Sequence, residues 1–382
     1  MSVTTTERYD LVIRGARVID AAQDLDAPAD IGIRGGRIAA VGRLPGSSNQ
    51  TLEATGLIAS PGWIDLHAHV AHKLGGTGVR PDQDAGIARG VTTVVDAGSC
   101  GAGTYEALSA YVIRGAATRV LAFLNVSLHT GIAPRHGHWE NFDQKQTIAM
   151  VERHPGEIVG VKVLASRTHC GAMALTPVKL AVQAARLSGT PVMCHIGNAP
   201  PIIQDVLALL DAGDIVTHCW HGKPGGLLDR RGRPIPEARA AADRGVLFDI
   251  GHGSQSFSFE TARRAMEADL RFHTISTDLH TRNLAGPVHD MATTMAKFLH
   301  LGCSLRQVIA ASTFAPAGAL GLEREIGTLR PGTAADVTLC RLREGPLRVS
   351  DSAGRSEDAR HTLDVVHTVR GGRIVFSASP VG

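Results

Sequence analysis

The first sign of chemistry is a pair of histidines in Pro61–Val70, PGWIDLHAHV. This segment is typical of a short buried strand opened by a Pro-Gly turn. Side chains alternate along a strand, so Asp65, His67 and His69 are expected to project to one side. Neutral imidazole is the commonest protein ligand for zinc and similar metals. His67 and His69 therefore predict part of a metal site, with Asp65 orienting an imidazole, although a chain with 18 histidines can also contain such a pair by accident.

Similar polar residues interrupt four later apolar runs. Lys162 lies in GVKVLAS, His195 in VMCHIG, His218 in VTHCWHG and Asp278 in ISTDLH. Each is a charged or metal-binding type whose burial is costly without a partner. Taken one at a time, the two histidines could be core residues bonded to backbone carbonyls, and Lys162 could be a cation paired with an acid. Their regular placement favours a shared metal centre.

Other polar residues follow these strands and are candidates for substrate contact. Arg167, in SRTHCG, is a possible anchor for a substrate carboxylate because a guanidinium binds a carboxylate through two hydrogen bonds. A surface salt bridge is the alternative. His252 is a second candidate, as are three further loop histidines, although plain loop polarity also explains them: His72, His221 and His280. The loop GHGSQSFSFE could close over a substrate or be an ordinary turn.

The elements that position these residues alternate between strand-like and helix-like segments. We expect eight strands, within the residue ranges 61–70, 91–99, 119–127, 158–166, 190–198, 214–222, 245–253 and 273–281. Amphipathic stretches of helical period separate most of them, including 104–117, 143–154, 176–189 and 260–270. Eight such units predict an α/β fold, a (β/α)8 TIM barrel, whose chemistry lies at the carboxyl ends of the strands. A doubly wound sheet is less favoured because no Gly-x-Gly-x-x-Gly follows a strand.

Hairpin-like segments occur at both ends of the chain. Tyr9–Val41 and the region after residue 322 alternate apolar and polar residues around Arg-Gly and Gly-Gly turns. We therefore expect a small β-sandwich built from both termini, residues 1–57 and 323–382, around a barrel formed by residues 58–322.

Composition narrows the class of protein. Of the 382 residues, 43% are hydrophobic and 20% charged, and the net charge of +3 argues against nucleic acid or an anionic membrane as a partner. The six cysteines have no paired spacing and are expected to be reduced. The polar N-terminus lacks the features of a signal peptide, and no long apolar run occurs. These features predict a cytoplasmic protein that acts on a small molecule.

The combination of PGWIDLHAHV, the lysine of the fourth strand, the two later histidines and the aspartate of the eighth resembles the amidohydrolase superfamily in its binuclear form. The resemblance implies that His67, His69 and Asp278 hold one metal, that His195 and His218 hold the other, and that Lys162 bridges them. The metals would be two divalent ions, Zn²⁺ being expected. Burial beside two cations would leave the lysine neutral, so that it captures carbon dioxide as a bridging carbamate.

The implied reaction is hydrolysis by a hydroxide that bridges the metals. Asp278 would be the catalytic residue, which accepts the proton of the hydroxide and passes it to the leaving group. VKVLASRTHCG, VTHCWHGKP and DIGHGSQSFSF are most similar to a deacetylase-like group that includes acetyl-(R)-mandelate esterases. We therefore expect cleavage of an acyl ester or amide in a substrate that carries a carboxylate. A homo-oligomer is expected by resemblance only.

Other activities of the superfamily fit less well. Dihydroorotases carry an arginine soon after the first His-x-His, whereas VAHKLGG follows here and the next arginine is Arg80. Deaminases use a glutamate near the histidine of the fifth strand, and this strand offers only Met-Cys-His. Ring opening of the dihydropyrimidinase or hydantoinase type is the main alternative. A non-catalytic barrel scaffold is a further one, and the chain keeps all six expected ligands.

Overall fold

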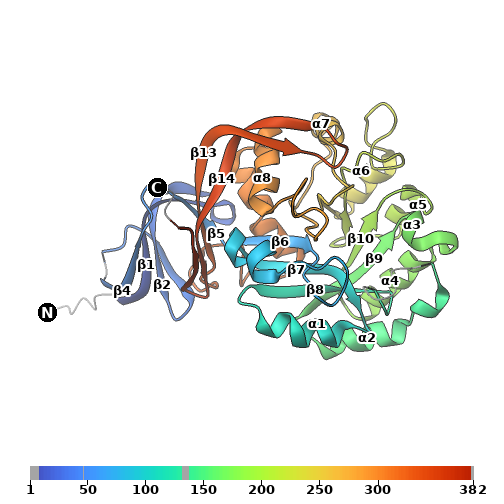
Figure 1. Cartoon of the computed structure of the whole chain (residues 1–382), viewed down its shortest axis with the longest axis horizontal. Coiled ribbons are helices and arrows are strands. Elements are labelled where there is room, and N and C mark those ends of the chain that lie inside the picture. The colour runs from blue at the N-terminus through green and yellow to red at the C-terminus, as the bar shows by residue number, and fades with distance from the viewer. Residues whose placement is uncertain (1–7, 46, 131–136, 380–382) are drawn as a thin grey trace.

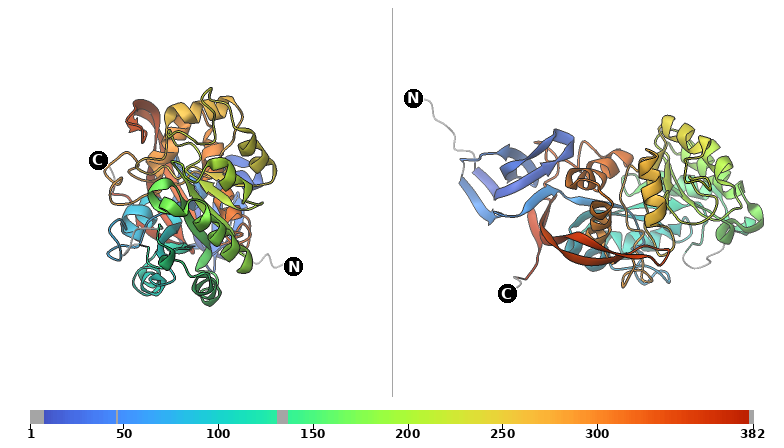
Figure 2. Two further views of the ribbon diagram at one scale, coloured as in Figure 1. Left: turned by 90° about the vertical axis from the view of Figure 1, so that its right-hand side faces the viewer. Right: turned by 90° about the horizontal axis from the view of Figure 1, so that it is seen from above.

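The computed structural model describes residues 8–45, 47–130 and 137–379 of the chain. It contains two sheets, a parallel sheet that curls into a barrel and a mixed sheet built from both ends of the chain, which we call the terminal sheet (Figure 1). The two lie at opposite ends of an elongated molecule (Figure 2). No helix in these described ranges is long and apolar enough to cross a membrane.

Seven strands form the parallel sheet, each paired with the next along the chain. Their positions confirm the predicted order of βα units. They are rich in valine and buried on both faces, as expected for parallel strands covered by helices. The strands are β6 (Trp63–Ala68), β7 (Val91–Gly101), β8 (Arg119–Asn125), β9 (Ile158–Ala165), β10 (Val192–Ile196), β11 (Ile215–Thr217) and β12 (Leu247–Asp249).

An extended segment, residues 274–279, closes the barrel in the position of the predicted eighth strand. It bridges β12 through Asp249 and Thr274, and β6 through Ala68 and Leu279. These are single bridges, and the described residues form no continuous eighth strand here. The strand is not continuous because Asp278 has a φ of 48°, which interrupts the extended conformation just before the bridge to β6.

Helices cover the barrel and hold its strands in place. The predicted helices at 143–154 and 176–189 are confirmed within a residue or two. The helix predicted at 104–117 is shorter than expected, because its α-helical part ends at Tyr111. The α-helices are α1 (Tyr105–Tyr111), α2 (Gln144–Arg153), α3 (Arg167–Cys170), α4 (Thr176–Leu187), α5 (Ile203–Ala208), α6 (Pro236–Asp243), α7 (Phe259–Glu267), α8 (Met291–His300), α9 (Leu305–Ala311) and α10 (Phe314–Ala319). Short 3-10 turns lie at Ala21–Gln23, Ile87–Arg89, Ile113–Gly115, Trp139–Asn141 and Gly171–Met173, and a π turn lies at Pro81–Ala85.

The terminal sheet confirms that the two ends of the chain assemble together. Its hydrogen-bonded order is β15-β14-β13-β5-β1-β2-β3, with β4 beside β1. The first four residues of the predicted insert, β5, therefore pair with the terminal strands, and the barrel begins at β6. The strands are β1 (Arg8–Asp20), β2 (Leu25–Arg34), β3 (Arg37–Gly42), β4 (Ser47–Glu53), β5 (Ile58–Pro61), β13 (Val337–Ser350), β14 (Ser356–Arg370) and β15 (Arg373–Ser377).

Apolar packing supports the carboxyl ends of the barrel strands. The large core between strands and helices includes Cys194 and Cys219, and all six cysteines are free of disulfides. A smaller cluster from alternate positions of neighbouring strands fills the barrel below the site: Leu66, Val95, Ala97, Leu121, Phe123, Met193 and Ile215.

One long hairpin connects the two ends of the molecule. β13 and β14 run from the terminal sheet along the barrel to α7 and α8 (Figure 1). At the tip, the Asp351 carboxylate accepts a hydrogen bond from the first backbone N–H of α7, at Phe259, and the Ser352 hydroxyl donates to the Gly253 carbonyl at 2.8 Å. The terminal sheet thus supports the loop that follows β12.

Candidate metal centre

Residues from four strands and from the closing segment 274–279 meet at the mouth of the barrel. They line a cavity of about 540 Å³ whose wall includes all six predicted metal ligands. Further lining residues come from the loops, among them Ser99, His169, Asn198, Lys223, Gln255, His280 and Arg282. The predicted ligands are therefore close to one another in space.

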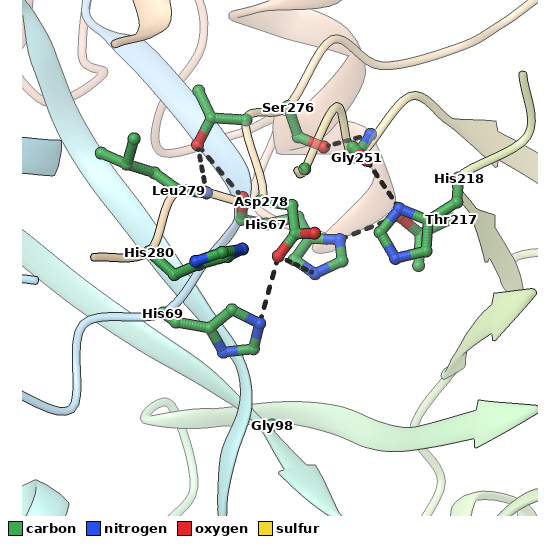
Figure 3. Close-up of polar contacts among 12 residues, drawn as sticks. His67, His69, Gly98, Thr217, His218, Gly251, Ser276, Asp278, Leu279 and His280 are labelled. Carbon is green, nitrogen blue, oxygen red and sulfur yellow. Dashed lines mark hydrogen bonds and ion pairs between the residues drawn. The ribbon is translucent and has the colours of Figure 1, made fainter. Parts of the chain in front are cut away.

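His67, His218 and Asp278 form the centre of this group. One potential ligand atom from each lies within 4.8 Å of the others, a spacing suited to a shared metal ion. The Oδ1 atom of Asp278 is 3.5 Å from Nε2 of His67 and 3.2 Å from Nε2 of His69, so Asp278 lies between the two rings (Figure 3). The His195 ring is 4.5 Å from that of His218, measured between centroids.

The outward nitrogens of three rings have hydrogen-bond partners. His67 Nδ1 lies 2.8 Å from the Thr217 hydroxyl, and His69 Nδ1 lies 2.8 Å from the Ser99 hydroxyl. His218 Nδ1 donates to the carbonyl of Gly251 at 2.6 Å. Contacts of this kind orient metal-binding imidazoles and leave Nε2 for the metal.

A buried aspartate that sequence reasoning missed supports this arrangement. Asp249, the last residue of β12, accepts hydrogen bonds of 2.6 to 2.8 Å from the hydroxyl groups of Thr217, Thr274 and Ser276. Through Thr217 it fixes the ring of His67. An aspartate within the apolar run GVLFDIG was the available signal.

The expectation that Asp65 orients an imidazole is wrong. Its carboxylate accepts hydrogen bonds from the backbone N–H groups of His67 and Thr277 and from the Thr277 hydroxyl. Asp65 therefore ties β6 to the segment that closes the barrel. Burial raises the pKa of this carboxyl group to about 7, against the effect of those hydrogen bonds.

Lys162 lies on the floor of the cavity and is completely buried. Its Nζ atom is 3.1 Å from His67 Nε2 and 3.4 Å from the sulfur of Met193. Burial lowers the pKa of the lysine to about 8, although Asp278 and Asp249 oppose the shift. A minor fraction of the amine is therefore neutral near neutral pH, a larger fraction than for an exposed lysine, and carbamate formation requires this neutral form.

The other ionisable groups have the protonation states that a metal site needs. Burial lowers the pKa of His67 to about 4 and that of His195 and His218 well below the ordinary value, so their rings are neutral. Burial by itself would raise the pKa of Asp278, but the facing imidazoles, that of His67 foremost, hold it far below its usual range. The site thus combines neutral nitrogen donors with an anionic carboxylate.

Glycines provide the space that these side chains occupy. A Cβ atom on Gly98 would lie 2.6 Å from Cγ of Lys162, and one on Gly251 would lie 2.8 Å from Nδ1 of His218. A Cβ atom on Gly253 would lie 2.3 Å from Oδ2 of Asp278. All three glycines have positive φ angles, which other residues rarely adopt.

The two predicted substrate contacts lie elsewhere. Arg167, the first residue of α3, is exposed, and neither it nor His252 belongs to the described lining of the cavity. His252 is fully buried, with Nε2 only 2.8 Å from Nζ of Lys297 on α8. It therefore packs behind the loop that faces the site, and its prediction as a substrate contact has no support from this position. The role of Arg167 stays a prediction.

Lys223 is a lining residue that sequence reasoning did not single out. It follows β11 in the loop HGKPGG, and its side chain is half-buried. The position after a ligand-bearing strand was a usable signal. His280, which was a candidate, does line the cavity, whereas His221 is buried beneath the loop.

The donor set fits divalent transition metals. Neutral imidazole nitrogens and one carboxylate, held on rigid strand ends with their outer atoms hydrogen-bonded, are typical ligands of zinc and similar ions. The buried lysine among them would become an anionic, bidentate ligand if it were carboxylated. Without metals, the cluster would contain several buried donor atoms directed at one another at considerable cost.

Comparison with known proteins gives consistent results. The model of the amidohydrolase family matches residues 58–375. Deacetylase Atu3266 of Agrobacterium fabrum is 36% identical over 352 residues, which cover 90% of this chain and 85% of the relative. A deacetylase of Enterococcus faecalis is 35% identical over 372 residues, which cover 96% of this chain and 99% of the relative.

Solved structures agree in fold and differ in their names. A crystal structure described as an adenine deaminase superposes with a TM-score of 0.91 at 34% identity, over 97% of this chain and all of the other. One described as a dihydroorotase superposes with a TM-score of 0.88 at 33% identity, over 96% of this chain and 99% of the other. The L-hydantoinase of Arthrobacter aurescens, at 16% identity and a TM-score of 0.71 over 97% of this chain and 96% of its own, shares the fold.

Proposed function

Because the chain belongs to the amidohydrolase family, we propose that it is a metal-dependent hydrolase that cleaves an acyl ester or amide bond, as a deacetylase does. The observation that carries the proposal is the convergence of His67, His218 and Asp278 beside the buried Lys162. The similarity to deacetylases of two bacteria along nearly the whole chain supports the proposed bond type.

The proposed centre holds two divalent metal ions, zinc being the expected one. His67, His69 and Asp278 would hold one ion, and His195 and His218 the other, with Lys162 shared as its carbamate. When bound, the metals would acidify a water molecule and polarise the acyl oxygen. The identity of the metals and the carbamate are part of the proposal.

Asp278 moves the proton in this scheme. Its carboxylate is anionic, because its pKa lies far below the usual range, and it faces the cavity. It would accept a proton from the attacking water at a carboxylate oxygen. It would then donate that proton to the leaving oxygen or nitrogen, so that the alcohol or amine leaves neutral.

The imidazoles keep their places during this cycle. The contacts of His67 with Thr217 and of His218 with the Gly251 carbonyl hold each ring in one orientation. Burial lowers the pKa of both rings, so both rings are neutral near neutral pH. Neither ring therefore donates a proton in place of the water.

Deamination and dihydroorotate hydrolysis receive less support from the lining of the cavity. Among the described lining residues there is no glutamate, and β10 offers only Met193, Cys194 and His195 near its end. Arg80, the first arginine after the His-x-His pair, forms an ion pair with Asp84 and is not among the described lining residues. Hydantoinase-like ring opening remains the alternative reaction, and a scaffold without activity the alternative role.

The experiment is a hydrolysis panel on protein loaded with divalent metal and bicarbonate. Substrates are acetyl esters of 2-hydroxy acids, including acetyl-(R)-mandelate, N-acetyl amino acids of both hands, cyclic imides and adenine. We expect turnover of an ester or acyclic amide that a chelator abolishes and added metal restores. Turnover of cyclic imides or adenine alone would assign the alternative reaction. Purified protein that contains little metal and acts on none of these would favour the scaffold.

A further inference from the structure

The described lining of the cavity contains more cationic than anionic side chains. Lys223 and Arg282 both belong to its lining, whereas Asp278 is the single carboxylate among the described lining residues. The metals of the proposed centre would neutralise Asp278. A negatively charged substrate would then find positively charged side chains around the bond that is cleaved.

Lys223 is held in place by the turn that carries it. Its backbone N–H donates to Nδ1 of the buried His221 ring at 3.1 Å. Gly226 packs on the same ring, since a Cβ atom there would lie 3.0 Å from it, and Gly222 packs just as closely on Ser258. The turn therefore wraps around one buried ring and fixes the base of the Lys223 side chain.

The charge of Lys223 acts on several residues that line the cavity. Burial lowers the pKa of Lys223, and the attraction of Asp278 opposes that shift. The same ammonium group helps lower the pKa of His169 and of His195, which burial already depresses. In the described part of the chain, no acidic side chain forms an ion pair with Lys223.

We propose that Lys223 anchors the carboxylate of the substrate, an inference that rests on the proposed deacetylase function. The ligand class is an acyl ester or amide with a carboxylate beside the acylated carbon, such as an O-acetyl 2-hydroxy acid or an N-acetyl amino acid. The ammonium group would bind the carboxylate while the acyl group reaches the metal donors.

Burial distinguishes Lys223 from Arg282, which also lines the cavity, and from Arg167, the anchor that the sequence suggested. Arg167 and Arg282 are exposed, so water and salt screen their charges. Lys223 is half-buried, and an ion pair formed there is attracted more strongly because the effective dielectric constant is lower. Lys223 therefore takes the role that the sequence suggested for Arg167.

The test compares two substrates that share one scissile bond, an N-acetyl amino acid and its neutral carboxamide. In Lys223→Met we expect kcat/KM for the acid to fall about 10- to 100-fold more than kcat/KM for the carboxamide, mainly through KM. Lys223→Arg should recover much of the preference. Lys179→Met, which removes an exposed lysine of α4, should leave the ratio of the two values within about twofold.

Equal losses on both substrates in Lys223→Met would overturn the proposal, and so would a larger change of the ratio in Arg167→Met or Arg282→Met. Binding of (R)-mandelate by calorimetry separates this inference from the proposed function. If the native protein hydrolyses neither substrate but Lys223→Met alone weakens mandelate binding, the function fails and the anchor stands. If hydrolysis is normal but mandelate binds Lys223→Met as tightly as the native protein, the anchor fails and the function stands.

Discussion

Two of the proposed ligands have backbone conformations that ordinary residues avoid. His218 has a φ of 71° and Asp278 a φ of 48°, and both directly follow extended segments. Such conformations cost of order 1 kcal/mol or more and persist where the surroundings impose them. Three hydrogen bonds impose them here. His218 donates to the Gly251 carbonyl, the Asp278 backbone N–H donates to the His67 carbonyl, and the side-chain amide of Asn283 donates to the Asp278 carbonyl. The strain directs both side chains into the cavity.

The proton-transfer role of Asp278 predicts a large kinetic effect. Asp278→Asn keeps the size of the side chain and one metal-binding oxygen, but the amide cannot accept a proton. We expect kcat to fall by about 10² to 10⁴, with much of the metal retained by elemental analysis. Asp205→Asn, a change of an exposed carboxylate on α5, is the control. Near-normal turnover of Asp278→Asn would contradict the assignment.

The lowered pKa of Lys162 predicts that loading depends on pH. Only the neutral amine captures carbon dioxide, and with a pKa of about 8 the neutral form is scarce at low pH and predominates above pH 8. Metal-free protein incubated with metal, at one fixed concentration of dissolved carbon dioxide, should therefore gain activity several-fold faster at about pH 9 than at about pH 6.5, when both samples are assayed afterwards at one pH. Equal rates of activation would mean that Lys162 acts without carboxylation.

At the scale of elements, the loop after β12 forms the back wall of the site. Gly253 contacts Asp278 on one side, and its carbonyl accepts the hydrogen bond of Ser352 from the β13–β14 hairpin on the other. The loop is therefore held between a ligand and a hairpin that belongs to the terminal sheet. This arrangement explains how strands far from the barrel contribute to the geometry of its centre.

Gly253→Ala tests this arrangement. The new Cβ atom would lie 2.3 Å from Oδ2 of Asp278, so the carboxylate must move. We expect kcat/KM to fall about a hundredfold, because displacements near 1 Å have effects of that size. Gly35→Ala is a matched control, since Gly35 has the same φ of 56° and nothing lies within 4 Å of the added atom. Similar activity of the two variants would show that Asp278 tolerates the displacement.

Across the whole molecule, the sequence predicted which residues lie at the carboxyl ends of the strands. It did not predict the hydrogen bonds that support these residues. Side chains alternate along apolar strands, and all barrel strands run in one direction. These two rules place His67, His195 and Asp278 at the same end of the barrel, independently of the loop conformations. The partners of Asp249 come from two separate segments, the end of β11 and the closing segment 274–279, and they meet only once the order and register of the strands are known.

His252 shows a second kind of limit. It follows β12 as the ligands follow their strands, which suggested the cavity as its place. The flanking glycines, Gly251 and Gly253, both have left-handed backbone and turn the histidine toward Lys297 on α8. Residue type and spacing do not reveal such a turn, because glycine adopts either sign of φ with similar ease.

The contact between the two sheets gives a prediction about stability. Asp336, just before β13, is buried, and its carboxylate binds Arg119 of the barrel at 2.8 Å and the backbone N–H of Gly371 at 2.9 Å. Asp336→Asn leaves Arg119 without its charged partner and should lower the free energy of unfolding by about 1 to 3 kcal/mol, as measured in urea.

An exposed pair of the same chemistry shows what burial contributes. Arg348 and Asp358 lie 3.1 Å apart on the β13–β14 hairpin, and both side chains are 64% exposed, against 3% for Asp336. Asp358→Asn should change the free energy of unfolding by less than about 0.5 kcal/mol. If both variants lost the same stability, burial of Asp336 would not account for its effect. If only Asp336→Asn is destabilised while its folded fraction keeps full turnover, the contact joins the sheets without shaping the metal centre.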